Sequence, residues 1–266
     1  MESLFIAKSK NSKDILHSDE TTVQVLHEPR QASTFKSYMW RYHTGGEDSP
    51  IVLYDYQKTR AGEHTKQFLK GFKGYLHVDR YAGYHKVSSV TLVGCFVHAL
   101  RKFDETLKVL PESKRHSNVT ACEGLNCCNK LFAIDRDLKE CTPEERYEKR
   151  LECRQPVLET FSAWLNTQKS KVIPKSLLGK AITYCLNQRE KLVAFLEDGR
   201  LEIDNNRSER SIKPFIIGRK NLIFSNTPKG AKASLIINSI METAKENNLI
   251  LFIIFNTYLR SFPTWT

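Results

Sequence analysis

Three acidic residues, by their positions in the sequence, are candidates for the carboxylates of a phosphoryl-transfer site: Asp19, Asp79 and Glu209. This chemistry uses several carboxylates that converge on two divalent metal ions about 4 Å apart. Magnesium prefers hard oxygen ligands and keeps water and substrate phosphates in its coordination shell. The three residues are therefore candidate metal ligands, provided that the fold brings them together.

Glu209 has the most distinctive surroundings, because it is the only acidic residue between Arg207 and Lys232. The cations of this stretch are Arg207, Arg210, Lys213, Arg219, Lys220, Lys229 and Lys232. A single carboxylate can pair with one or two of these cations and leaves the others for a different partner. The excess of positive charge favours contact with the phosphate backbone of a nucleic acid.

Each of the three acids also has a structural interpretation. Asp19 suits a turn or an edge strand, and Asp79 suits the cap of a helix that begins near Arg80. Glu209 suits a surface ion pair with Arg210 or Lys213. Taken singly, an acidic residue in a basic protein is more often structural. The catalytic interpretation is favoured because each of the three acids falls on a strand or helix that carries a catalytic acid in one expected core.

The elements that must position these acids follow from the hydrophobic and β-branched patterns. The predicted strands are 15–26, 37–43, 51–56, 74–78 and 90–96, and the predicted helices are 63–72 and 97–109. Three strands in a meander, followed by alternating helices and strands, describe a mixed α/β sheet in the order of a ribonuclease-H-like core. In such a core Asp19 lies on the first strand, Asp79 ends the neighbouring fourth strand, and Glu209 lies on a later helix.

The long gap between Asp79 and Glu209 is explained by a charged, mostly helical insertion at 111–200. The core is predicted at 1–110 and 201–248, and 249–266 is an atypical tail. The residues expected to face the helical core of the insertion are Tyr147, Leu151, Leu158, Phe161, Trp164 and Leu165. Pro156 is expected to kink their helix. Asn205 or Asn206 is expected to cap the helix that carries Glu209.

Composition indicates the kind of partner. The formal net charge is +11 and hydrophobic residues make up 40% of the chain, which fits a cored protein with a polyanionic partner such as nucleic acid. The N-terminus has no signal-peptide pattern, and the apolar run 249–255 is too short to span a membrane. Seven cysteines without an export signal indicate reduced structural thiols and a cytoplasmic location.

Several separate motifs, in order, resemble one known family. They are Asp19-Glu20-Thr21, the stretch from Tyr75 through Asp79 to Tyr84, the stretch from Cys95 through His98 to Phe103, and Asp204 to Arg210 running on to Gly218-Arg219-Lys220-Asn221. With these motifs the chain resembles the transposases of the insertion-sequence-66 family, of the Asp-Asp-Glu class, over about residues 14–249.

This resemblance implies that Asp19, Asp79 and Glu209 are the catalytic, metal-binding triad of a ribonuclease-H-like domain. It implies two Mg²⁺ or Mn²⁺ ions when DNA is bound. The reaction would be hydrolysis at transposon ends, followed by attack of the freed 3′-hydroxyl on target DNA. A homo-oligomer is expected when the protein is active, associated with the bacterial nucleoid. The residues expected to contact DNA phosphates are Arg207, Arg210, Lys213, Arg219 and Lys220, and those expected near the site are His98, Arg101, Asn205 and Asn206.

The chain also departs from the family pattern. Arg80 stands where glycine is usual, and Leu100 stands where arginine is usual. The N-terminal helix-turn-helix and zinc-binding modules of the family are expected to be absent. The apolar tail after Leu249 suggests a shifted reading frame. These departures motivate an alternative function, an inactive or regulatory remnant that binds DNA without cleaving it.

Overall fold

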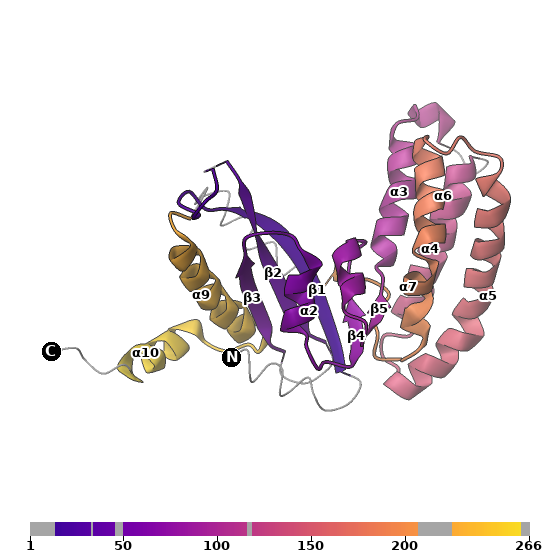
Figure 1. The fold of residues 1–266 in the computed structure, drawn as a ribbon. Helices are drawn as coiled ribbons and strands as arrows, with labels where there is room; N and C mark the ends of the chain where they lie inside the picture. The colour runs from indigo at the N-terminus through magenta and orange to yellow at the C-terminus, as the bar shows by residue number, and fades with distance from the viewer. Residues whose placement is uncertain (1–13, 33, 46–49, 116–118, 207–224, 262–266) are drawn as a thin grey trace. The chain divides into compact units, whose positions relative to one another are not determined.

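The computed structural model describes residues 14–32, 34–45, 50–115, 119–206 and 225–261 (Figure 1). Within these residues the fold is mixed α/β, with eight α-helices and one five-stranded sheet in the order β3-β2-β1-β4-β5. The chain divides into two compact units. The first draws on residues 1–76, 81–90 and 206–266, and the second on 77–80 and 91–205. No helix of the described ranges is long and apolar enough to cross a bilayer.

An antiparallel meander forms the sheet of the first unit, as predicted. It consists of β1 (Asp14–Gln24), β2 (Lys36–Thr44) and β3 (Val52–Gln57). The register pairs Asp19 with Arg41 and Glu20 with Trp40, so these two neighbouring acids point to opposite faces. Five consecutive residues of the central strand, from Met39 to His43, are buried because both faces of β2 are covered.

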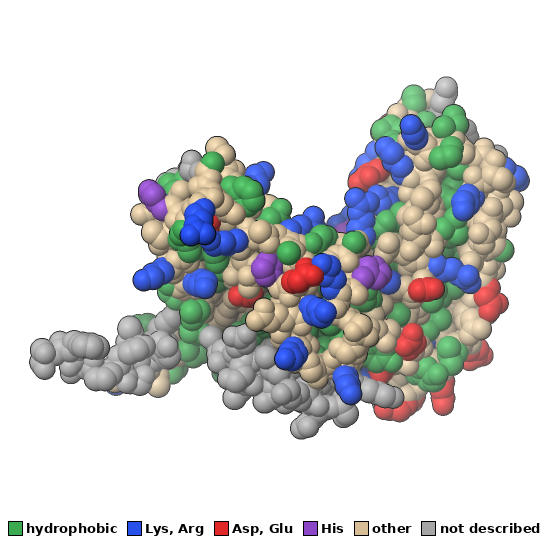
Figure 2. All heavy atoms as spheres, viewed as in Figure 1, with side chains coloured by type: hydrophobic (Ala, Val, Ile, Leu, Met, Phe, Trp, Pro, Cys, Tyr) green, Lys and Arg blue, Asp and Glu red, His purple; other side chains and the backbone are tan. Residues whose placement is uncertain are grey.

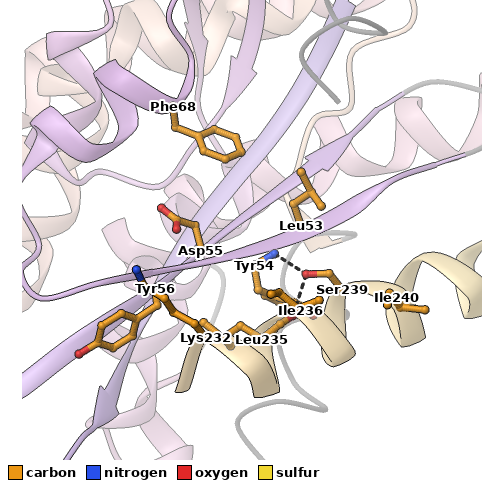
Figure 3. Close-up of a pocket in the computed structure, with 10 residues that line it drawn as sticks. All are labelled: Leu53, Tyr54, Asp55, Tyr56, Phe68, Lys232, Leu235, Ile236, Ser239 and Ile240. Carbon is orange, nitrogen blue, oxygen red and sulfur yellow. Dashed lines mark hydrogen bonds between the residues drawn. The ribbon is translucent and has the colours of Figure 1, made fainter. Parts of the chain in front are cut away.

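One side of this sheet packs against α9 (Pro228–Glu246), which lies along β3 (Figure 1). The shared core consists of Val23, Val25, Met39, Val52, Tyr54, Tyr56, Ala231 and Leu235. The hydroxyl groups of Ser239 and Thr243 accept hydrogen bonds from the backbone N–H groups of Tyr54 and Val52, at 2.9 and 3.0 Å. These bonds satisfy donors that an edge strand otherwise leaves open. A pocket of about 630 Å³ remains beside them, lined mainly by apolar side chains (Figure 3).

The opposite face is covered by α2 (Gly62–Phe68) and the 3₁₀ helix η1 (Ala82–Lys86). Tyr42 stacks on Phe68 with ring centres 3.9 Å apart, and Trp40 meets Tyr84 edge to face. The two short helices touch through Gly62. A side chain built there would place its Cβ only 2.3 Å from the carbonyl oxygen of Gly83.

The second unit contains the end of β4 (Gly74–His77), the strand β5 (Thr91–Val93) and most of the helices. The helices are α3 (Phe96–Lys108), α4 (Thr120–Asp137), α5 (Pro143–Lys169), α6 (Leu177–Asn187) and α7 (Arg189–Val193), with 3₁₀ turns at Glu112–Lys114 and Ala194–Leu196. Phe103 of α3 packs against Phe161 and Trp164 of α5, which forms an aromatic core for this helical layer.

Three arginines are spaced about one turn apart on α5, and two of them bind the backbone at Gly199, where the chain leaves the helical region. Arg146 and Arg150 both donate to the carbonyl oxygen of Gly199, at 3.3 Å each. Arg150 and the fully buried Arg154 form ion pairs with Asp135 of α4. This arginine ladder therefore fixes the path of the chain just before residues 201–206.

Several predicted details of the helical region differ from the structure. The strand predicted at 90–96 is limited to Thr91–Val93, because Phe96 already begins α3. Leu158, Phe161 and Leu165 are buried as predicted, but Tyr147 is 39% exposed. Within the predicted helical insertion, residues 177–196 are divided at Gln188 into α6, α7 and a 3₁₀ turn. The tail forms a helix, α10 (Leu251–Ser261), in which Phe252 and Ile253 are exposed.

Candidate active site

Asp19 lies on the face of β1 that it shares with Arg41, its partner in the register. Its Oδ1 accepts a hydrogen bond from the backbone N–H of Glu20 at 2.8 Å. Arg41 is fully buried. Burial lowers the pKa of its guanidinium, and the charges of Tyr54, Asp19 and Glu246 oppose that effect. Asp19 is thus a half-buried carboxylate within the electrostatic reach of a buried cation.

The neighbouring acid, Glu20, is tied into the opposite face. Its side chain is 1% exposed and forms an ion pair with Arg60, whose Nε lies 2.8 Å from Oε1. The hydroxyl of Tyr84 donates to Oε2 of Glu20 at 2.6 Å and accepts from Ser18 Oγ at 3.2 Å. Burial and the nearby carboxylates raise the pKa of Tyr84, so this hydroxyl stays protonated. Glu20 therefore joins β1 to η1 and has a structural role.

Asp79 follows the end of β4 in the second unit. The preceding residue, Val78, donates its backbone N–H to the carbonyl oxygen of Val93 at 2.9 Å, which aligns this segment with β5. Asp79 lines a pocket of about 290 Å³, which we call the Asp79 pocket. Its lining residues are Asp79, Arg80, His98, Arg101, Lys102, Glu105 and Tyr184.

The predicted near-site residues His98 and Arg101 are therefore in the same pocket as Asp79. Both lie on α3, and the buried residues of that helix occupy its other side. His98 is half-buried and Arg101 is exposed. The structure places these two residues in the pocket that Asp79 lines, and their role in a site stays a prediction.

Asn205 has a fixed position at the junction between β5 and α3. Its backbone N–H donates to Cys95 Sγ at 3.3 Å, and the N–H of Phe96 donates to the carbonyl oxygen of Ile203 at 3.1 Å. Cys95 is 1% exposed, and burial raises its pKa to about 11, so it acts as a packed neutral thiol. Asn206 is the last residue described before Arg207, and the helix that Asn205 or Asn206 was predicted to cap lies outside the described residues.

Ser225 is the first described residue after 207–224, and it lies beside the end of β1. Ser225 donates its N–H to the carbonyl oxygen of Gln24 at 2.9 Å and accepts from the N–H of Leu26 at 3.0 Å. His27 adds a bond from its backbone N–H to the carbonyl oxygen of Asn226 at 2.9 Å. These contacts anchor the chain on the strand that carries Asp19.

The third predicted carboxylate, Glu209, lies outside the described residues, and so do Arg207, Arg210, Lys213, Arg219 and Lys220. Among the residues that the structure does describe, no group of three or more His, Cys, Asp or Glu side chains is placed to hold a metal ion. Asp19 belongs to the first unit and Asp79 to the second. Both supply the hard carboxylate oxygens that Mg²⁺ and Mn²⁺ prefer, so the described donors fit the expected metal in chemical type.

Sequence reasoning missed four residues around Asp79. Lys102 and Glu105 share the pocket, and their spacing from His98 along α3 is the signal that could have revealed them. Tyr184 and Lys191 come from the helical region far along the chain, where no local pattern points to Asp79. Lys191 is 8% exposed, and its carbonyl oxygen accepts the N–H of Gly94 at 2.8 Å.

The described residues define a mixed α/β protein with a five-stranded sheet and a pocket lined by Asp79 and the polar side of α3. Residues 5–233 match the model of the family described as Transposase IS66 family, and the chain belongs to that family.

Three curated proteins of Sinorhizobium fredii (strain NBRC 101917 / NGR234) are similar to the chain. Uncharacterized protein y4qI is 28% identical over 260 residues, which cover 92% of this chain and 47% of that protein. Uncharacterized protein y4hP is 27% identical, with 88% and 45% covered, and uncharacterized protein y4jD is 29% identical, with 90% and 48% covered. The chain spans about half the length of these relatives.

Proposed function

We propose that this chain is the catalytic portion of a transposase that cuts and joins DNA by metal-dependent phosphoryl transfer. Asp19, Asp79 and Glu209 would hold the metal ions. The DNA substrates would be the ends of an insertion sequence and a target site. The proposal includes a ribonuclease-H-like core, at least two copies of the chain on the two DNA ends, and a cytoplasmic protein associated with the nucleoid.

The family membership carries this proposal, and the contacts around the Glu209 segment support it. The described residues before this segment are anchored at the β5–α3 junction through Asn205 and Cys95. The described residues after it are anchored at the end of β1 through Ser225 and Gln24. The described residues that precede this segment, up to Asn205, thus belong to the unit of Asp79, and those that follow it contact the strand of Asp19.

Divalent magnesium or manganese, when bound, would supply the Lewis acidity that activates the attacking oxygen and stabilises the leaving oxygen. The role of the chain's own residues is to hold the carboxylates in position. Glu20, Tyr84 and Ser18 fix β1 against η1, which limits the movement of Asp19. The bond from Val78 to Val93 fixes the backbone next to Asp79. The cations of the Glu209 segment are proposed to hold the DNA backbone.

A nicking assay on supercoiled plasmid tests the proposal. The parent protein should convert the plasmid to nicked circles only when Mg²⁺ or Mn²⁺ is present. Asp79→Asn should lower this rate on the order of 100-fold or more, because a catalytic unit loses most of its activity with one member. Asp104→Asn is the matched control, since Asp104 lies on α3 and pairs with Lys108 away from the Asp79 pocket.

Two results would contradict the proposal. Equal nicking by the parent and by Asp79→Asn would indicate a contaminating nuclease. DNA binding that depends on salt, without metal-dependent nicking by the parent, would instead support a remnant that binds DNA and does not cleave it.

A further inference from the structure

The polar side chains of α3 form a stripe along one side of the helix. His98, Arg101, Lys102 and Glu105 recur at helical spacing and line the Asp79 pocket together. The buried stripe of the same helix, with Phe96, Ala99, Phe103 and Leu107, fixes its rotation. In the space-filling view, Lys and Arg side chains gather on the side of the helical unit around α3 (Figure 2).

Lys102 is the member of this stripe with the best-defined environment. Its ammonium lies 5.2 Å from the centre of the Tyr184 ring, which is a cation–π arrangement. Tyr184 is buried, and burial raises the pKa of its hydroxyl, so this ring is a neutral support. Within the described part of the chain, Lys102 has no ion pair. Its charge is held at the pocket without being neutralised by a carboxylate.

The pocket holds more cations than acids. Its lining contains three cations, Arg80, Arg101 and Lys102, and two acids, Asp79 and Glu105. Outside the lining, Lys191 is 8% exposed, and its ammonium has no hydrogen-bond acceptor in the described residues. Burying an ammonium without a partner is costly. A site with this excess of positive charge is suited to an added anion.

We propose that the Asp79 pocket binds the phosphodiester backbone of DNA, with Lys102, Arg101 and Arg80 contacting phosphate oxygens. Guanidinium groups donate in a fork that matches two oxygens of one phosphate, and lysine provides a compact charge beside it. This inference rests on the proposed function for its substrate class. It adds a DNA contact on α3, far in sequence from the cations around Glu209, and places a phosphate next to Asp79.

Fluorescence anisotropy with a labelled 20-base-pair duplex tests this inference, using the full chain at several potassium chloride concentrations without divalent metal. Lys102→Gln is expected to raise Kd about 5- to 10-fold and to reduce the slope of log K against log salt by roughly 0.9, the value for one phosphate contact. Lys108→Gln should stay within about twofold, because Lys108 lies on the same helix, is 68% exposed at its side chain and pairs with Asp104.

Further variants keep the test decisive. Lys102→Arg should keep most of the binding, because it keeps the charge. If Lys102→Gln fails to fold, as judged by thermal melting, Arg80→Gln replaces it, since Arg80 is exposed. Equal weakening by the Lys102 and Lys108 variants, or unchanged binding by the Lys102 and Arg80 variants, would overturn the inference. The proposed function is judged separately by the nicking rate of Asp79→Asn, so either idea can fail alone.

Discussion

Asp19 and Glu20 are adjacent in sequence and have different surroundings. Asp19 lies on the face of β1 that carries Arg41, and Glu20 is enclosed on the opposite face by Arg60 and Tyr84. The alternation of a strand causes this difference, because neighbouring side chains point to opposite faces. Glu20 stabilises the fold, and Asp19 is the acid proposed to serve the chemistry.

Glu20→Gln is expected to lower the free energy of unfolding by about 1–3 kcal/mol, because it removes the charge from a buried hydrogen-bonded ion pair. Urea unfolding at neutral pH measures this change. Glu63→Gln is the matched control, since Glu63 also pairs with a cation, Lys86, but its side chain is 62% exposed. The control should change stability little. Equal losses in both variants would refute the structural role given to Glu20.

Among single residues, the sequence singled out Asp19, Asp79, His98 and Arg101 as site candidates and did not single out the lysines. His98 and Arg101 line the same pocket as Asp79, and their role in a site stays a prediction. Lys191 was beyond prediction, because its approach to Asp79 depends on how the chain returns from the helical region to β5. The structural role of Glu20 follows from its long-range contact with Tyr84, which no local pattern reveals.

At the scale of elements, two glycines control how α2 meets η1. A Cβ at Gly62 would lie 2.3 Å from the carbonyl oxygen of Gly83, and backbone cannot give way as a flexible side chain can. Gly62→Ala is therefore expected to destabilise the protein by about 1–3 kcal/mol, measured by urea unfolding.

Gly230→Ala is the matched control for this prediction. Gly230 lies in the first turn of α9, and its nearest contact for an added Cβ is at 3.4 Å, an ordinary van der Waals distance. Alanine favours helix over glycine, so this variant should be neutral or slightly stabilising. A Gly62→Ala protein as stable as the parent would show that the two short helices can separate without cost.

The strands and helices of the first unit were predictable because their patterns are local. The hydrophobic and β-branched runs of β1 to β3 and the Thr227-Pro228 start of α9 are signals within single segments. The helical region was predicted less well, because packing decided its details. Pro156 lies inside α5 and does not end this helix. The part of α5 after Pro156 packs into the core through the buried side chains of Leu158, Phe161 and Leu165. Tyr147 was expected inside and is 39% exposed, whereas Arg150 and Arg154 of the same helix are buried.

The whole chain forms two compact units. The segment that carries Glu209 lies in sequence between described residues that are anchored at Cys95 in the second unit and at Gln24 in the first. The family membership fixes the class of protein, and the three curated relatives are about twice as long. The central claim is that Asp19 and Asp79 work as one catalytic centre.

The most direct test compares metal-dependent nicking rates of Asp19→Asn, Asp79→Asn and the double variant. Members of one centre are strongly non-additive, so each single variant should lose nearly as much activity as the double variant, on the order of 100-fold or more. Thermal melting should show that all three proteins remain folded. A single variant that keeps the parent rate, or losses that multiply in the double variant, would contradict the claim that the two carboxylates share one centre.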